Sequence, residues 1–124
     1  MAKILIVDNE KSLLDLYSAI LVKNGYEVLT ASSAKEGFAL AVSAHPDLIL
    51  LDVMMPSVDG ADAFVSLSEN ASTKHIPVIF LTSIVNEEEV EAARGKIRGR
   101  EFISKSTPMD KFIVRVKTAL SSGS

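Results

Sequence analysis

The sequence predicts an α/β protein in which a parallel sheet carries helices on both faces. Two observations lead to this fold class. Short apolar runs rich in β-branched residues alternate with segments of helical periodicity, and the connections between them are short. Strict alternation is typical of a parallel sheet, because each parallel pair of strands needs a crossover that is usually a helix.

The candidate strands are nearly continuous apolar runs. Such runs suit strands that are buried on both faces, between two layers of helices. In chain order they are KILIVD (3–8), EVLTA (27–31), DLILLD (47–52), PVIFLT (77–82) and the weaker EFIS (101–104).

The segments between the strands carry apolar residues at helical spacing. Asn24-Gly25 is a typical helix C-terminus, and Ser33 with Glu36 forms a capping box at the start of the second helix. The basic run RGKIRGR (94–100) is interpreted as the end of the fourth helix, where positive charge complements the helix dipole. The apolar faces consist of Ala34, Phe38, Ala41 and Val42 in the second helix, Val90, Ala93 and Ile97 in the fourth, and Phe112, Val116 and Leu120 in the last.

The composition is that of one globular domain. The chain has 124 residues, of which 48% are hydrophobic and 23% charged. We therefore expect residues 1–124 to form a single domain, with 121–124 as a disordered tail. A net charge of −3 argues against a general nucleic-acid binder, which needs a basic surface. With no cysteine, no signal peptide and no long apolar run, we expect a cytoplasmic protein that does not contact a membrane.

Polar side chains gather where the predicted strands end. Asp8 ends the first strand, Asp52 the third and Thr82 the fourth, while Lys105 follows the fifth. In a parallel sheet these ends share one edge, and ligands bind there near the point where strand order reverses. Each residue alone has an ordinary explanation in a turn, a strand or a solvated loop. Their convergence predicts a functional site.

Two carboxylates, a hydroxyl and an ammonium group can support phosphoryl transfer. Carboxylate oxygens suit Mg²⁺, and Asp52 could attack phosphorus to give an aspartyl phosphate. The Lys105 ammonium and the Thr82 hydroxyl would then stabilise the phosphoryl oxygens. This chemistry would explain why a carboxylate ends the most apolar strand, where its desolvation is costly.

These motifs resemble the receiver domain of two-component response regulators. The resemblance covers residues 2 to about 120 and rests on ILIVDNE, PDLILLDVMMPSVDG, IPVIFLTS and EFISKS. It implies a flavodoxin-like, doubly wound (βα)5 fold whose five parallel strands have the order 2-1-3-4-5. It also implies that a sensor histidine kinase or a histidine phosphotransfer protein phosphorylates Asp52. The fourth helix, fifth strand and fifth helix would then present the output surface to a downstream protein target or effector domain.

The resemblance assigns a role to each site residue. Asp52 is the phosphoacceptor, and Thr82 and Lys105 bind the phosphoryl group. Thr82 and Phe102 are the switch pair, in which the aromatic ring turns inward on activation. Met54 and Ile84 govern the water that hydrolyses the phosphoaspartate, and because both are apolar we expect a long-lived phosphoryl group. The Mg²⁺ ligands are Asp8, Asn9, Asp52 and the backbone carbonyl of Met54.

Two residues depart from the family pattern. The family usually has a second aspartate where this chain has Asn9, and an amide oxygen brings no charge to the metal. We therefore expect weaker Mg²⁺ binding and slower phosphorylation. The family usually has a proline after the lysine, in a cis bond, where this chain has Ser106. A cis bond before serine would cost about 2.5–4 kcal/mol, so we expect a trans bond and a differently shaped loop around Lys105.

Other functions remain open at this stage. Asn9 and Ser106 also suit a degenerate receiver that binds proteins without phosphorylation. A phosphohydrolase with an aspartate nucleophile commonly has a second aspartate as general acid where this chain has Met54, so that acid is missing here. A flavin-binding domain of the same topology needs a hydroxyl- and glycine-rich phosphate loop after the first strand, where this chain has the acidic DNEKS. We expect a switch rather than an enzyme, without direct nucleic-acid binding. Whether it is a monomer or a phosphorylation-dependent dimer stays open.

Two further features have ordinary explanations beside functional ones. His45 and His75 precede the third and fourth strands, at the edge away from the site, so a catalytic role is not expected. The first helix, SLLDLYSAILV, is apolar around much of its circumference. Core packing explains most of this, and a kinase-docking surface would explain the excess.

Overall fold

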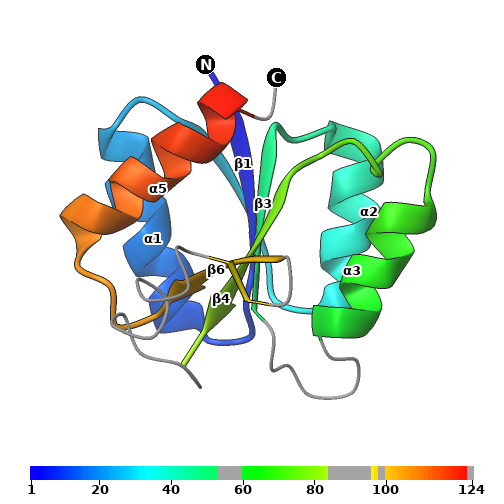
Figure 1. Cartoon of the computed structure of the whole chain (residues 1–124), viewed down its shortest axis with the longest axis horizontal. Coiled ribbons are helices and arrows are strands. Elements are labelled where there is room, and N and C mark those ends of the chain that lie inside the picture. Colours follow the sequence, from blue (N-terminus) through cyan, green and yellow to red (C-terminus); the bar gives the residue numbers. More distant parts are fainter. Residues whose placement is uncertain (53–59, 84–95, 98–99, 123–124) are drawn as a thin grey trace.

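The computed structural model describes residues 1–52, 60–83, 96–97 and 100–122, and it shows one sheet between two layers of helices (Figure 1). The strand order is β2-β1-β3-β4-β6-β5. The first five strands in this order pair in parallel. Strand β6 is the fifth strand that the sequence predicts, so the predicted order 2-1-3-4-5 is confirmed. The strands are β1 (Lys3–Val7), β2 (Glu27–Ala31), β3 (Leu48–Asp52), β4 (Val78–Thr82), β5 (Lys96–Ile97) and β6 (Arg100–Ser104).

The short strand β5 corrects the prediction for the fourth helix. Ile97 was expected on an apolar helical face, but Lys96 and Ile97 pair antiparallel with Glu101 and Arg100 of β6. Lys96, Ile97 and Arg100 of the basic run are therefore in strands and do not end a helix. Gly95 and Gly99 flank the pair in the sequence, and glycine disfavours a helix interior by about 1 kcal/mol relative to alanine. Val90 and Ala93 lie outside the described residues.

The described helices form two layers. Helices α1 (Lys11–Lys23) and α5 (Met109–Ser122) cover one face of the sheet, and α2 (Ala34–Ala44) and α3 (Gly60–Glu69) cover the other (Figure 1). Helix α5 includes Ser121 and Ser122, so the predicted disordered tail over 121–124 begins too early. None of the described helices is long and apolar enough to cross a lipid bilayer.

Alternation along the strands divides the core between the two faces. Ile4 and Ile6 pack on the side of α1 and α5, whereas Leu5 and Val7 pack on the side of α2. All five residues of β3 are buried. This burial on both faces is what the continuous apolar runs predict, and it makes the C-terminal ends of the central strands rigid attachment points.

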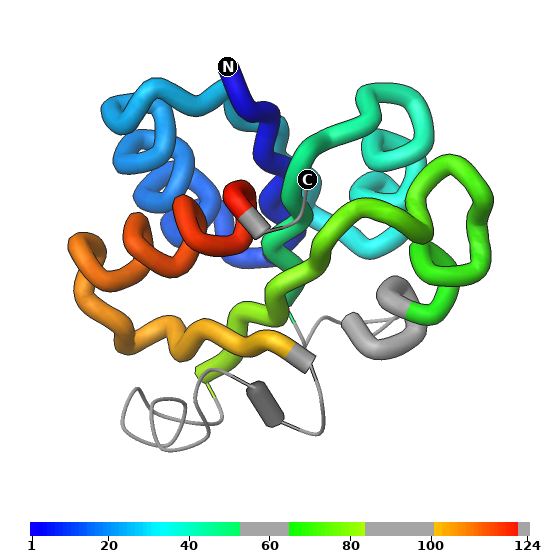
Figure 2. Tube along the Cα trace, turned by 45° about the horizontal axis from the view of Figure 1, so that its top comes forward, coloured from blue at the N-terminus to red at the C-terminus, as the bar shows by residue number. Residues whose placement is uncertain are grey.

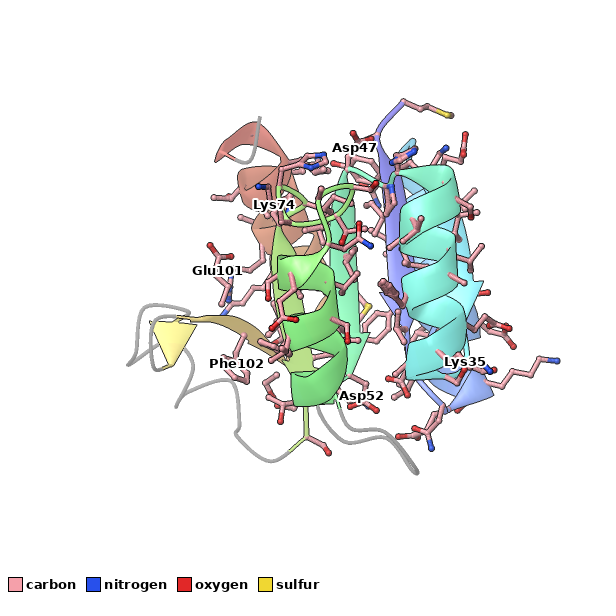
Figure 3. All side chains as sticks on the ribbon, turned by 90° about the vertical axis from the view of Figure 1, so that its right-hand side faces the viewer. Lys35, Asp47, Asp52, Lys74, Glu101 and Phe102 are labelled. Carbon is pink, nitrogen blue, oxygen red and sulfur yellow. The ribbon has the colours of Figure 1, made fainter. Side chains whose placement is uncertain are left out.

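The two ends of the parallel strands carry different groups of the predicted residues. Figure 3 shows Asp47 at one end of the sheet and Asp52 at the other, with Phe102 toward the end that carries Asp52. His45 caps the C-terminus of α2, and His75 precedes β4, so both lie near the edge where β3 and β4 begin. Strand β6 runs beside β4 and leads into α5 on the face that α1 covers (Figure 2).

Candidate functional site

Asp8 lies immediately after β1 and is fully buried. Its backbone amide donates to the carbonyl oxygen of Ala31 at 3.0 Å, which extends the pairing of β1 with β2 by one residue. Its Oδ1 accepts a hydrogen bond of 2.9 Å from the backbone amide of Glu10. The carboxylate is thus held at the C-terminal edge of the sheet by its own loop.

Asp52 and Thr82 end the two neighbouring central strands. Asp52 pairs with Leu81 in the β3–β4 register, and it is 3% exposed. Thr82 pairs with Ser104 in the β4–β6 register and is equally buried. The structure therefore brings the ends of four strands together at the edge that the sequence indicates.

Lys105 connects the two carboxylates. Its Nζ lies 2.8 Å from Oδ2 of Asp8 and 3.4 Å from Oδ1 of Asp52, and its side chain is 10% exposed. Its backbone amide donates to the carbonyl oxygen of Thr82 at 2.7 Å. One residue thus joins β1, β3 and β4 at the site, through its side chain and its main chain.

The electrostatics of the site keep this ammonium charged. Burial alone would lower the pKa of Lys105, but the hydrogen bond and negative charge of Asp8, together with the charge of Asp52, raise it above its usual range. The charges of the site also act on the phenol of Tyr17 in α1, whose ring centroid lies 4.7 Å from that of Phe112 in α5. Burial raises the pKa of the Tyr17 phenol, Lys105 opposes this, and the carboxylates add to it. The phenol is therefore neutral at physiological pH.

The loop after Lys105 has the expected backbone. Among the described residues no peptide bond is cis, so the Lys105–Ser106 bond is trans, as the serine predicts. The trans bond does not remove Lys105 from the site, since its ammonium reaches both carboxylates. Ser106 is therefore compatible with a trans bond that leaves the Lys105 ammonium in the site.

The remaining predicted residues stand apart from this ion-pair cluster. Asn9 is exposed beside Asp8. Phe102 is half-buried on the α2 side of the sheet, and its ring centroid lies 5.2 Å from that of Phe80. Met54 and Ile84 lie outside the described residues, so their predicted roles stay predictions.

Two residues that sequence reasoning did not assign lie beside Lys105. Oε1 of Glu10 is 3.6 Å from the Lys105 ammonium, on a side chain that is 58% exposed. The hydroxyl of Ser104 contacts Ser106 rather than solvent. Glu10 directly follows Asp8 and Asn9 in the sequence, and this position was a signal that Glu10 lies at the site. The contact of Ser104 depends on the loop conformation, which no sequence pattern reveals.

The donor atoms at this edge fit Mg²⁺. Oδ2 of Asp8 is buried, and its one partner among the described residues is the Lys105 ammonium at 2.8 Å, so a second lone pair of this oxygen remains for a cation. The described residues contain no group of three or more His, Cys, Asp or Glu that could hold a metal ion. A magnesium ion here would thus depend on two carboxylates, neutral oxygens and water, a combination that Mg²⁺ commonly takes.

The fold and the site define a doubly wound α/β domain with a buried site of two carboxylates and an ammonium at the C-terminal ends of its strands, and comparison with known proteins specifies the family. The model of the response regulator receiver domain matches residues 4–117. Protein PilH of Pseudomonas aeruginosa is 34% identical over 121 residues, which are 97% of this chain and 98% of PilH. The polar-differentiation response regulator DivK of Brucella ovis is 32% identical over 118 residues, 94% of each chain. The chain belongs to the response regulator receiver domain family.

Other relatives differ in length but share the fold. The DNA-binding dual master transcriptional regulator RpaA of Synechocystis sp. is 34% identical over 97% of this chain, which spans 49% of RpaA. The structure of the chemotaxis protein CheY4 of Vibrio cholerae superposes with a TM-score of 0.81 at 27% identity, and it covers 95% of this chain and 98% of CheY4. The same domain thus occurs in relatives of one-domain length and in longer ones.

Proposed function

We propose that the chain is a working receiver, in which Asp52 accepts a phosphoryl group from a phosphohistidine of a sensor histidine kinase or histidine phosphotransfer protein. One observation carries the proposal. The Lys105 ammonium lies within 3.4 Å of the Asp52 carboxylate and 2.8 Å of Asp8, in a buried site at the end of the central strands. A carboxylate fixed beside a permanent positive charge is suited to receive a group that brings new negative oxygens.

The chemistry needs no further protein nucleophile. An oxygen of Asp52 attacks the phosphorus atom, the phosphorus–nitrogen bond breaks, and the imidazole nitrogen keeps the electron pair and takes a proton. Lys105 and the Thr82 hydroxyl would stabilise the transferred oxygens. Magnesium, held by Asp8, Asn9, Asp52 and the Met54 carbonyl, would supply additional positive charge to the phosphoryl oxygens.

The phosphoryl group would act as a switch. Thr82 would move toward it, and Phe102 would fill the space behind Thr82, which shifts the balance between two conformations of the output surface. That surface would include β6 and α5 and would contact a downstream protein or effector domain. The proposed setting is the cytoplasm, as a monomer or a phosphorylation-dependent dimer, in a single domain without catalytic turnover of its own. Apolar Met54 and Ile84 would give a long-lived phosphoryl group.

Two residues support a second function, that of a degenerate receiver. Asn9 removes one charge from the proposed metal set, and Ser106 replaces the proline that the family usually has. Both suit a degenerate receiver that binds a partner without phosphorylation. The ion pairs of Lys105 favour the working receiver, because a binding module has no need to hold a buried ammonium between two carboxylates.

The experiment is phosphorylation by phosphoramidate, a small donor with the phosphorus–nitrogen bond of phosphohistidine. Intact mass is recorded with Mg²⁺ and with a chelator, for the wild type and for Asp52→Asn. A gain of one phosphoryl group that requires both Mg²⁺ and Asp52 supports the working receiver. A folded wild type that gains no mass favours the degenerate receiver, and repeating the assay with Asn9→Asp tests whether the missing charge is the cause.

A further inference from the structure

Ser104 is the last residue of β6 and is 1% exposed. Its hydroxyl oxygen accepts a hydrogen bond of 3.2 Å from the backbone amide of Ser106, and the two serine hydroxyls lie 2.8 Å apart with a shared hydrogen bond. Its carbonyl oxygen accepts a hydrogen bond of 3.0 Å from the amide of Thr107. Ser104 therefore holds the next three residues in a tight turn, and Lys105 is the first of them.

These bonds fix the main chain on both sides of Lys105. The amide before its Cα donates to Thr82 of β4 at 2.7 Å. The amide after it, that of Ser106, donates to the Ser104 hydroxyl at 3.2 Å. With both flanking peptide groups held, the side chain leaves the main chain in one direction, toward Asp8 and Asp52.

This arrangement needs a residue with a backbone amide hydrogen at position 106, and Ser106 adds a hydroxyl that also contacts Ser104. A proline there would have no amide hydrogen, so it could not donate to the Ser104 hydroxyl. The Ser104 hydroxyl would then be left in a buried position without this donor, which is costly. Ser104 and Ser106 therefore act as a pair, and we refer to them as the serine clamp.

We propose that Ser104 is a positioning residue, which acts through the serine clamp to direct the Lys105 ammonium at the group transferred to Asp52. The proposal rests on the proposed phosphoacceptor function. Ser104 itself is not expected to touch the phosphoryl group. Its contribution is orientation, and small losses of orientation at a reacting centre reduce rates strongly.

The test uses three variants. Ser104→Ala removes the acceptor of the clamp, Ser104→Thr keeps a hydroxyl on a residue that suits a strand, and Ser18→Ala removes a buried hydroxyl of α1 that has no hydrogen-bond partner among the described residues. We expect Ser104→Ala to be phosphorylated about tenfold more slowly by phosphoramidate at saturating Mg²⁺. Ser104→Thr should recover most of the rate, Ser18→Ala should match the wild type, and the Mg²⁺ affinity should be unchanged in all three.

A spectroscopic readout follows the ammonium directly. The ¹³Cε signal of Lys105, assigned with Lys105→Met, should shift in Ser104→Ala and return in Ser104→Thr. A merely structural role would lower the melting temperature without this shift. If Ser104→Ala does not fold, Ser106→Ala decides, because it keeps the amide donor and loses only the hydroxyl. It should be phosphorylated about threefold more slowly, a fraction of the tenfold loss.

The outcomes separate the two proposals. A wild type that gains no phosphoryl group overturns the proposed function, and the clamp is then judged by the Lys105 signal alone. A wild type that is phosphorylated at the same rate as Ser104→Ala overturns the clamp. Equal losses in Ser104→Ala and Ser104→Thr, with an unchanged Lys105 signal, overturn it as well.

Discussion

The Lys105 ammonium lies 2.8 Å from Oδ2 of Asp8, and this ion pair links the first strand of the sheet to the loop after the last parallel strand. Both groups are largely withdrawn from solvent, with side-chain exposures of 10% and 0%. At this depth a charge is tolerated only when another charge or a polar network compensates it. In the site, the charge of one ammonium therefore compensates part of the charge of two buried carboxylates.

Removing the ammonium should destabilise the protein. Lys105→Met keeps a chain of similar length but leaves Asp8 and Asp52 without their cation, and we expect a loss of roughly 3 kcal/mol in the free energy of unfolding at neutral pH. Added Mg²⁺ should restore part of this stability, and restore more in the variant than in the wild type. Urea unfolding with and without Mg²⁺ measures both effects. The exposed Lys35→Met is the matched control and should change little.

The raised pKa of Lys105 predicts where stability depends on pH. Because the pKa in the folded state lies above the ordinary value of 10.5, the charged form stabilises the fold below that pH. This contribution is lost as pH rises above 10.5 through the folded-state pKa. Tyr17 titrates in the same direction, so the wild type is compared with Lys105→Met, which keeps Tyr17. Urea unfolding of both proteins from about pH 8 to about pH 11 spans the ordinary pKa of a lysine side chain. The stability difference between them should shrink at the alkaline end. A constant difference would contradict the charged pair.

Asn9→Asp should strengthen Mg²⁺ binding. The new carboxylate lies beside Asp8 at the exposed rim of the site, and one added charge attracts a divalent cation enough for about a tenfold gain in affinity. Without metal, the same charge should reduce stability slightly, because it adds repulsion. Titration calorimetry measures the affinity. Asn70→Asp adds an equal charge after α3, where its oxygen can still accept from Ser72, and it should leave the affinity unchanged.

Gly37→Ala should destabilise the fold although alanine favours helices. A Cβ at this position of α2 would lie 2.6 Å from Cγ2 of Val7, in the residue before Asp8. Overpacking of this kind costs about 1–3 kcal/mol, against a gain in helix propensity of about 1 kcal/mol. We expect a net loss near 1 kcal/mol by chemical denaturation. Combining Gly37→Ala with Val7→Ala should remove most of the steric part, and strictly additive losses would contradict the close approach.

The rings of Phe80 and Phe102 should be energetically coupled. Their centroids lie 5.2 Å apart with an interplanar angle of 31°. Aromatic pairs at this distance contribute about 0.5–1.5 kcal/mol beyond the area that they bury. A double-mutant cycle with Phe80→Leu and Phe102→Leu should give a coupling energy in that range. A coupling near zero would show that Phe102 is free to turn without a cost from Phe80.

Much of the site could be predicted because topology determines it. Once the runs ending in Asp8, Asp52 and Thr82 are assigned to parallel strands, their ends must meet at one edge. The position of Lys105 followed from the same rule, since its strand joins the sheet beside β4. The trans bond before Ser106 followed from the cost of a cis bond to a residue other than proline.

The wrong prediction and the missed contacts depend on tertiary contacts rather than on the order of the strands. Val90, Ala93 and Ile97 share helical spacing, but the last of them is in β5, because its pairing with Arg100 is a tertiary contact that periodicity does not reveal. The contacts of Glu10 and Ser104 depend on how two loops close over the sheet. Loop conformations of this kind are not encoded in a repeating pattern, so they become visible only in the structure.

The central claim is that Asp52 is the residue that carries the phosphoryl group, and chemical trapping tests it most directly. The phosphorylated protein is treated with borohydride, which reduces an aspartyl phosphate to homoserine, and the peptides are sequenced by mass spectrometry. We predict homoserine at position 52, dependent on Mg²⁺ during phosphorylation. Homoserine at Asp8, or a phosphoryl group on a serine or threonine with Asp52 unmodified, would contradict the account.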